Sequence, residues 1–368
     1  MSKRTDSRYV FFNNTKLFDN IFHNRFYLNC RIPLTVSAKR KGIAVIFSVD
    51  HPDRDSAPPL TYFDAVVLDA VYTALIGQSD SLPVCLSLYD IVAAMDGKDN
   101  VRSISRRFRE SISESLERLT SYTLAFDCES EYRSRHIGDP GWYPESPLLP
   151  AQLNRHPYKD PRDTSTYTAV GEVVVTSPIP LYQYAQRIGQ MVAAERSLIR
   201  GEGMVPLRSG RPDAPKKGTA NTIDFIMLRR YIIRRIEALR HTDLIRMPKT
   251  NLRVISLYRA EKNAAHHRTQ AGLLPDLGYD YPTLNADMSV DERRSLLTKW
   301  NHTLQKFRLS AVHLLDYYVR EGYIAGYRLI AADGGDAGGD GKPSEETDSP
   351  IDRKAQKLPR FMKIELIV

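Results

Sequence analysis

The sequence predicts an α+β protein, mainly helical, with two successive domains that each contain three helices followed by a β-hairpin. The chain has 368 residues, which is beyond the size at which one hydrophobic core usually divides into two. Hydrophobic residues make up 42% and charged residues 26% of the chain, the balance of a folded globular protein. The same order of helical and β-prone segments occurs in each half.

The first two helices of the amino-terminal half are marked by capping residues. Thr61 with Asp64 forms a capping arrangement before an apolar stripe at helical spacing. Ser87 with Asp90 repeats this arrangement before a shorter helix, for which Gly97 provides a stop. Each of these helices therefore has an identifiable start and one buried face.

A third helix and a hairpin complete this half. The helix begins near Ser103 and buries four apolar residues at helical spacing: Phe108, Ile112, Leu116 and Leu119. The β-prone segment 122–128 follows at once, and segment 167–176 is expected to pair with it. Between them, the proline-rich segment 136–163 has no sustained period and is predicted to be an irregular insertion. Three helices and a hairpin in this order predict a winged-helix domain.

Further segments set the expected domain boundaries. Apolar residues at 43–49 predict a strand near the amino terminus, and segment 180–199 predicts a connecting helix. Segment 201–220 combines glycine and proline with positive charge, which is typical of a basic linker. The amino-terminal domain is therefore expected over 1–200 and the carboxyl-terminal domain over 221–368.

The carboxyl-terminal half repeats the order with different residues, which predicts a second winged-helix unit. Its helices are expected at 222–236, 251–261 and 304–321, with Thr222 as the first cap, and its strands at 323–330 and 361–368. Between the strands, segment 332–357 is dominated by glycine, serine and acidic residues. It cannot bury enough apolar surface to offset its ordering entropy, so we expect a mobile acidic wing loop.

Charge and composition narrow the classes of function. Lysine and arginine exceed aspartate and glutamate by 52 to 44, a net charge of +8, which favours polyanionic partners. No apolar run reaches the ~18 residues of a membrane helix and the amino end is charged, so we expect a cytoplasmic protein that does not enter membranes. The 3 cysteines are too few and too far apart for a disulfide framework or a zinc site, and are interpreted as buried small hydrophobes.

The strongest candidate site is a basic cluster at the start of the third helix. Its members are Arg102, Ser103, Ser105, Arg106, Arg107 and Arg109. A helix that enters the major groove contacts base edges with its first turns. Arginine bonds guanine bidentately, while serine and backbone amides hold phosphates. The alternative is that these arginines form a solvated face or pair with Glu110 and Glu114.

A second group of cations lies along or just before the last helix. It comprises Lys299, His302, Lys306 and Arg308. Their spacing distributes them around the helix, so some must face solvent or the domain interior. We expect phosphate contact from this group rather than base reading.

Catalytic roles are not expected, and neither are cofactors or metals. Tyr317 and Tyr318 invite comparison with nicking enzymes that attack DNA with a tyrosine hydroxyl. That chemistry also needs a metal site, typically two histidines separated by one apolar residue, and no such triplet occurs. His266 and His267 are adjacent and would diverge on any regular element. A phosphate-binding loop of the Gly-Lys-Ser/Thr type is also missing from the sequence.

Three segments resemble a known family. Asn221–Glu237, Leu314–Tyr327 and Ser177–Ala185 resemble parts of the winged-helix replication initiators of plasmids and integrative conjugative elements in Gram-positive bacteria. This resemblance implies binding to origin DNA, often at repeated sites, followed by duplex opening and recruitment of a host helicase or helicase loader. A homodimer is also considered.

The leading hypothesis is therefore sequence-specific binding of double-stranded origin DNA by a replication initiator, without covalent chemistry. A transcriptional repressor or a partition adaptor of the same element is the alternative, and a tyrosine nicking enzyme is the third reading. The location of the bound DNA, at origin repeats or at a promoter, separates the first two.

Overall fold

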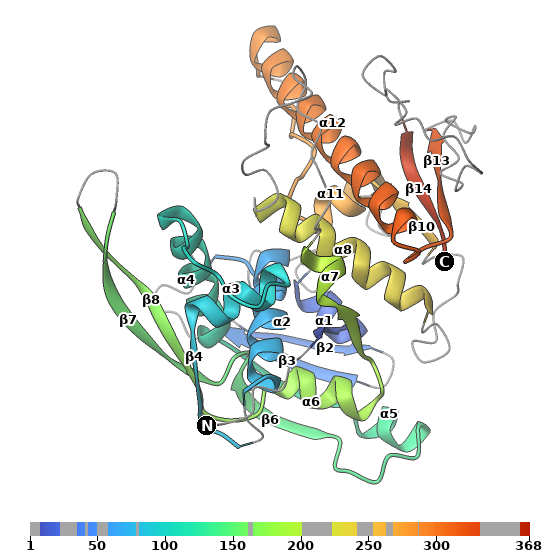
Figure 1. Ribbon diagram of the computed structural model, residues 1–368. Helices are drawn as coiled ribbons and strands as arrows, with labels where there is room; N and C mark the ends of the chain where they lie inside the picture. The colour runs from blue at the N-terminus through green and yellow to red at the C-terminus, as the bar shows by residue number, and fades with distance from the viewer. Residues whose placement is uncertain are drawn as a thin grey trace. The chain divides into compact units, whose positions relative to one another are not determined.

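The computed structural model describes residues 8–22, 35–40, 43–49, 58–78, 81–160, 165–200, 223–240, 253–262, 268–285, 287–331 and 361–368. The chain divides into two compact units, which we call unit 1 (Met1–Arg200) and unit 2 (Gly201–Val368). Each combines helices with small antiparallel sheets (Figure 1), so the protein is α+β. The predicted linker 201–220, the predicted acidic loop 332–357, Thr222, and His266 with His267 lie outside the described residues.

The three helices predicted for unit 1 are present. They are α2 (Tyr62–Ile76), α3 (Leu88–Asp96) and α4 (Arg106–Ser121). Capping boxes begin α2 at Thr61 and α3 at Ser87, as the sequence indicates. Gly97 ends α3 with φ at 67°, in the left-handed region that favours glycine. Ser105 caps α4, so this helix begins three residues after Ser103.

A three-stranded sheet accompanies these helices, in the order β4–β8–β7. Its strands are β4 (Val84–Ser87), β7 (Ala151–Lys159) and β8 (Thr166–Val175). The long hairpin partner of β8 is therefore β7, and the prediction that 122–128 pairs with 167–176 was wrong. The prediction of an irregular 136–163 segment was also wrong. Pro157 is accommodated because β7 is an edge strand, where a missing N–H costs no ladder bond.

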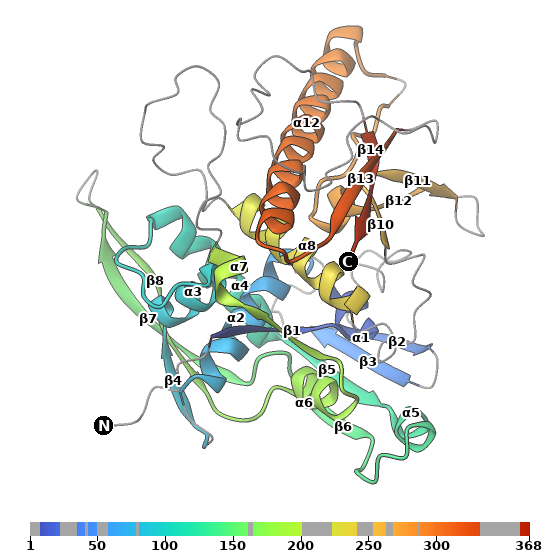
Figure 2. The ribbon, with the colours of Figure 1, turned by 45° about the vertical axis from the view of Figure 1, so that its right-hand side comes forward.

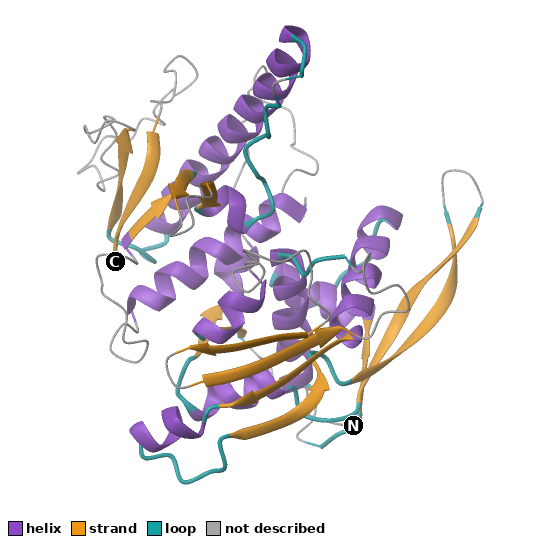
Figure 3. Cartoon of the chain, turned by 180° about the vertical axis from the view of Figure 1, so that it is seen from behind, coloured by secondary structure: helices purple, strands orange, loops and turns teal. Residues whose placement is uncertain are grey.

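The predicted strand at 122–128 belongs to a second sheet of unit 1. That sheet has the order β2–β3–β5–β6, formed by β2 (Thr35–Arg40), β3 (Ile43–Val49), β5 (Tyr122–Asp127) and β6 (Trp142–Pro147). The short helix α5 (Glu129–Ser134) connects β5 to β6. β5, α5 and β6 are therefore an insertion between α4 and the β7–β8 hairpin, and Figure 3 shows the hairpin as a separate long ribbon.

The predicted connecting helix is interrupted by a strand. The structure has α6 (Pro180–Arg187), β9 (Met191–Glu195) and α7 (Arg196–Arg200). A single helix over 180–199 was therefore a wrong prediction. Gly189 adopts φ at 67° and breaks the helix. β9 then pairs with β1 (Tyr9–Asn13), which precedes α1 (Lys16–Phe22).

The outer edge of β1 is held by buried side chains of α2. The Phe11 amide donates to Thr73 Oγ1 at 3.1 Å, and the Asn13 amide donates to Asp69 Oδ1 at 3.2 Å. Tyr182 from α6 donates its hydroxyl to the same Asp69 oxygen at 2.5 Å. Asp69 thus joins the amino-terminal strand, the first helix of the trio and the connecting segment.

Unit 2 contains its own three-stranded sheet, in the order β10–β14–β13. Its elements are α8 (Ile223–Arg240), β10 (Val254–Ser256), β11 (Arg259–Lys262), β12 (Arg268–Ala271), α11 (Leu273–Asp276), α12 (Val290–Arg320), β13 (Gly326–Ala331) and β14 (Phe361–Ile367). The helix predicted at 251–261 is absent, because this segment forms β10 and β11. The last helix begins at Val290 rather than at residue 304 and lies beside β13 and β14 (Figures 1 and 2).

The two units follow one order of elements. Each contains a helix, a short strand, a second helix, a third helix and a hairpin, and in each the second hairpin strand, β8 or β14, lies in the centre of a three-stranded sheet. Unit 1 also has β1, α1, β2 and β3 before this series and α6, β9 and α7 after it. Unit 1 inserts β5, α5 and β6 after its third helix, whereas unit 2 inserts the β11–β12 hairpin after its short strand. Among the described helices, none combines the length and apolarity needed to span a bilayer.

Candidate nucleic-acid interface

The start of α4 carries exposed positive charge. Ser105 Oγ accepts the amide of Phe108 at 3.4 Å and so caps the helix, and the first turn contains no acidic residue. Arg102 and Ser103 are exposed just before the helix, and Arg107 is exposed on its first turn. Within the described residues, neither Arg102 nor Arg107 has an ion-pair partner. These two guanidinium groups are therefore available to an anionic ligand.

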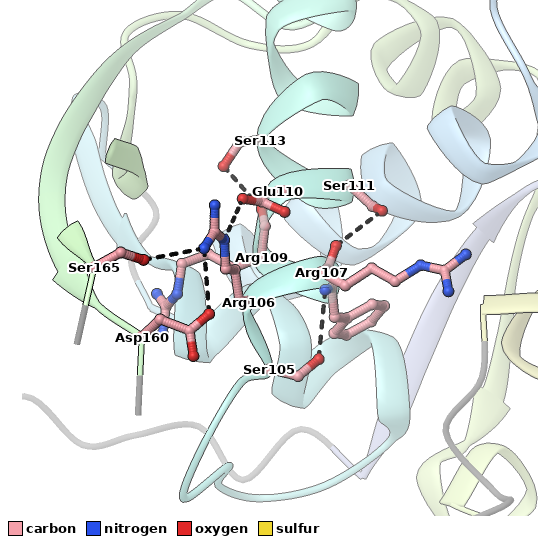
Figure 4. Close-up of polar contacts among 10 residues, drawn as sticks. Ser105, Arg106, Arg107, Arg109, Glu110, Ser111, Ser113, Asp160 and Ser165 are labelled. Atoms are coloured by element: carbon pink, nitrogen blue, oxygen red, sulfur yellow. Dashed lines mark hydrogen bonds and ion pairs between the residues drawn. The ribbon is translucent and has the colours of Figure 1, made fainter. Parts of the chain in front are cut away.

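Arg106 is engaged inside the unit. Its Nε donates to Glu110 Oε1 at 2.8 Å, and its Nη1 donates to Asp160 Oδ2 at 3.3 Å and to Ser165 Oγ at 3.4 Å. Its Cζ lies 4.8 Å from the ring centroid of Tyr167. The hydrogen bonds to Glu110 and Asp160 raise the pKa of Arg106. Figure 4 shows Arg106 directed at these partners while Arg107 points away from them.

Arg109 is buried, with 4% of its surface exposed. Its Cζ lies 3.8 Å from the ring centroid of Tyr158 on β7 and 5.6 Å from that of Tyr89 on α3. The expectation that Arg109 contacts DNA is therefore corrected, since a duplex cannot reach this guanidinium. The reason is tertiary, because its tyrosine partners come from other elements and are invisible in the helix pattern.

The sequence prediction missed a cation on the hairpin. Lys159 is exposed at the end of β7 and has no ion-pair partner within the described part of the chain. It lies between Tyr158 and Asp160, whose side chains contact arginines of α4, so strand alternation directs Lys159 to the opposite face of the hairpin near the start of α4. Arg155, also on β7, pairs with Glu117 of α4. Apolar and polar residues alternate only over 151–154, so the local signal for this strand was short.

In unit 2, exposed cations lie farther along the helix. Lys299 and His302 are exposed on α12, in its third and fourth turns. Arg308 is only 8% exposed, so the expectation that it contacts phosphate is corrected. The first turn of α12 carries Asp291 and Glu292 together with Arg293, and the exposed Arg294 follows.

Lys306 is tied to another helix of unit 2. Its Nζ lies 2.5 Å from Asp224 Oδ2 on α8, and the Tyr279 hydroxyl donates to Asp224 Oδ1 at 2.5 Å. Burial alone would raise the pKa of Asp224, but the bonds from Lys306 and Tyr279 outweigh it and hold the pKa below 3.8. Lys306 therefore has a partner within its own unit.

The side chains considered for catalysis are enclosed. Tyr317 and Tyr318 are 4% and 0% exposed, and burial raises the pKa of Tyr318. No group of three or more His, Cys, Asp or Glu residues suited to a metal occurs in the described residues. Cys128 is buried, which raises its pKa to about 12. Cys85 is exposed, contrary to its interpretation as a buried hydrophobe.

Comparisons with known proteins add little to this geometry. No protein-family model matches the sequence, and no curated protein matches it. A crystal structure of selenomethionine derivatives of domains 2 and 3 of RctB matches with 13% sequence identity and a TM-score of 0.28. The match covers 46% of this chain and 61% of that chain, less than two thirds of the RctB structure. A TM-score this low does not establish a shared fold.

Proposed function

We propose that this protein binds double-stranded DNA in a sequence-specific manner, and that unit 1 and unit 2 are both winged-helix units. The order of three helices and a hairpin supports this interpretation, as does the central position of the second hairpin strand, β8 or β14, in its three-stranded sheet. In unit 1 this makes α4 the helix that enters the major groove and β7–β8 the wing.

One observation carries the proposal. Arg102 and Arg107 stand exposed and unpaired, among the described residues, at a helix start that has no acidic side chain in its first turn. The amino end of a helix attracts anions through its free N–H groups and its dipole. Arginine at this position can contact the O6 and N7 atoms of guanine together. Arg107 is therefore assigned to base reading and Arg102 to the backbone.

Unit 2 is assigned a supporting role. Lys299 and His302 lie past the helix start, beyond the turns that contact base edges. Phosphate contacts fix the position of a protein on DNA but carry no direct sequence information. The net charge of +8 agrees with a partner of high negative charge density.

We further propose that the bound DNA is the replication origin of a plasmid or another mobile element. The resemblance of 221–237 and 314–327 to winged-helix initiators supports this choice. The protein partner that this resemblance implies is a host helicase or helicase loader, and a homodimer is proposed beside it. Footprinting of the bound DNA across the whole plasmid or mobile element tests this proposal. Protein bound at origin repeats would favour a role in replication initiation, and protein bound at a promoter would favour a role in repression.

The DNA-binding proposal is tested with Arg107→Gln. We expect the difference in binding free energy between the footprinted DNA site and random duplex to fall by about 1–3 kcal/mol, the contribution of one bidentate contact. Arg133→Gln is the matched control, since Arg133 is an exposed arginine of the same unit whose ion-pair partner among the described residues is Glu129. Competition binding at several salt concentrations measures both. An unchanged preference in Arg107→Gln would show that α4 does not read bases.

A further inference from the structure

One face of α4 is attached to the β7–β8 hairpin along most of the helix. The residues on this face follow helical spacing and are Arg106, Arg109, Ser113 and Glu117. Ser113 Oγ accepts the amide of Val170 on β8 at 3.0 Å. Glu117 pairs with Arg155 on β7. The two arginines near the helix start therefore belong to a face that binds the hairpin, whereas Arg107 lies outside it.

Two tyrosine rings of the hairpin form cation–π contacts with these arginines. Tyr158 and Tyr167 are cross-strand partners with ring centroids 5.8 Å apart. Arg109 Cζ lies 3.8 Å from the Tyr158 centroid, and Arg106 Cζ lies 4.8 Å from the Tyr167 centroid. Both distances are within the ~6 Å at which a guanidinium is attracted to a ring face. Gly171 leaves room for this, because a Cβ there would lie 2.7 Å from the Tyr158 hydroxyl oxygen.

Arg106 also forms hydrogen bonds to the hairpin at the point where its two strands end. The Asp160 amide donates to the Ser165 carbonyl at 2.8 Å, which continues the strand pairing past Lys159. The Arg106 guanidinium donates to Asp160 Oδ2 and Ser165 Oγ on the same side. Asp160 is 8% exposed, so its carboxylate is shielded from solvent and directed to the helix.

We propose that Arg106 and Arg109 are positioning residues that clamp the hairpin to α4, so that Lys159 and Arg107 meet one duplex at a fixed separation. This inference rests on the proposed function and gives the two arginines no contact with DNA. A two-stranded ribbon is marginally stable alone, and ordering it on binding would subtract from affinity. The clamp removes that cost by fixing the hairpin beforehand.

Asp160→Asn distinguishes the clamp from direct phosphate contact by Arg106, because the two predict opposite signs. In the clamp, losing the carboxylate frees the hairpin and weakens duplex binding about two- to fivefold, as Arg106→Gln also does. The double variant Arg106→Gln/Asp160→Asn should then be no weaker than Arg106→Gln alone. If Arg106 contacted phosphate, Asp160→Asn would remove a repelling charge and strengthen binding. Stronger or unchanged binding by Asp160→Asn overturns the clamp.

Hydrogen exchange of β7 and β8 peptides, measured without DNA, tests the clamp independently of the proposed function. Arg106→Gln and Asp160→Asn should both raise the exchange rate of the hairpin amides, while Arg133→Gln leaves it unchanged. If the hairpin loosens in these variants but the wild-type protein binds no duplex, the clamp stands and the proposed function fails. Unchanged exchange in both variants refutes the clamp, whatever the protein binds.

Discussion

In unit 1 the first and third helices of the shared order are joined by a buried ion pair, whereas in unit 2 the corresponding pair is partly exposed. Arg118 of α4 donates to Asp64 of α2 from Nη2 at 2.8 Å and from Nε at 3.1 Å, and the Asp64 side chain is 0% exposed. Lys306 of α12 meets Asp224 of α8 with side chains 49% and 28% exposed. The same two positions in the order of elements are therefore connected by ion pairs that differ greatly in their exposure to solvent.

The helix starts differ in the same direction. The first turn of α4 has no acidic residue, and exposed arginines surround it. The first turn of α12 contains Asp291 and Glu292, which suit the helix dipole but repel phosphate. The helix start of unit 2 therefore mixes two acidic residues with Arg293 and Arg294, whereas that of unit 1 has no acidic residue in its first turn.

The largest effect should come from breaking the buried ion pair between Arg118 and Asp64 in unit 1. Asp64→Ala leaves Arg118 without its carboxylate and removes the cap in which Asp64 accepts the Thr61 amide at 2.6 Å. We expect the free energy of unfolding of unit 1 to fall by about 3–5 kcal/mol. Urea titration followed by hydrogen exchange of α2 and α4 peptides measures it. A loss no larger than that of Asp224→Ala in unit 2 would remove the contrast between the units.

An intermediate effect should distinguish the charge patterns. Lys299→Gln removes one exposed cation of α12 and is expected to weaken binding to all duplexes alike, lowering the slope of log affinity against log salt by about 0.9. Arg320→Gln is the control on the same helix, because Arg320 is exposed in its last turn. If Lys299→Gln changes the preference between sites instead, unit 2 reads bases and the contrast with Arg107 is lost.

Capping residues in the sequence were sufficient to predict where the helices that they cap begin. The boxes Thr61 with Asp64 and Ser87 with Asp90 give the starts of α2 and α3. Ser289 with Glu292 forms the same box before α12, and following it would have placed that start correctly. The short apolar segment 254–257 fits a helix or a strand equally well, which explains the error there.

Those local signals could not predict which strands pair or which charged side chains are buried. Tyr122–Asp127 is a strand as predicted, but its neighbours are β6, the next strand along the chain, and β3, which lies far away in the sequence. The pairing of Arg106 with Glu110 could be read from helical spacing, but its second partner, Asp160, is 54 residues away and cannot. The sequence therefore predicted where arginines gather, and only the fold separates Arg107 from the two arginines of the clamp.

The smallest effect should come from breaking the partly exposed ion pair between Lys306 and Asp224 in unit 2. Lys306→Ala is expected to lower the free energy of unfolding of unit 2 by less than about 1 kcal/mol near neutral pH, because water screens the pair. The pKa of Asp224 is held below 3.8 in the folded protein. Its contribution is therefore complete at higher pH and is lost as pH falls through the lowered pKa, where the carboxylate is protonated in both states.

Wild type and Lys306→Ala should consequently differ near neutral pH and converge in acid. Urea midpoints of unit 2, followed by hydrogen exchange of α8 and α12 peptides from about pH 7 down to about pH 2, measure this. Lys299→Ala is the matched control, since Lys299 is an exposed lysine of the same helix. A difference that persists unchanged into acid would mean that Lys306 stabilises unit 2 through the packing of its alkyl chain. The two units would then differ in the kind of tie, and not only in its strength.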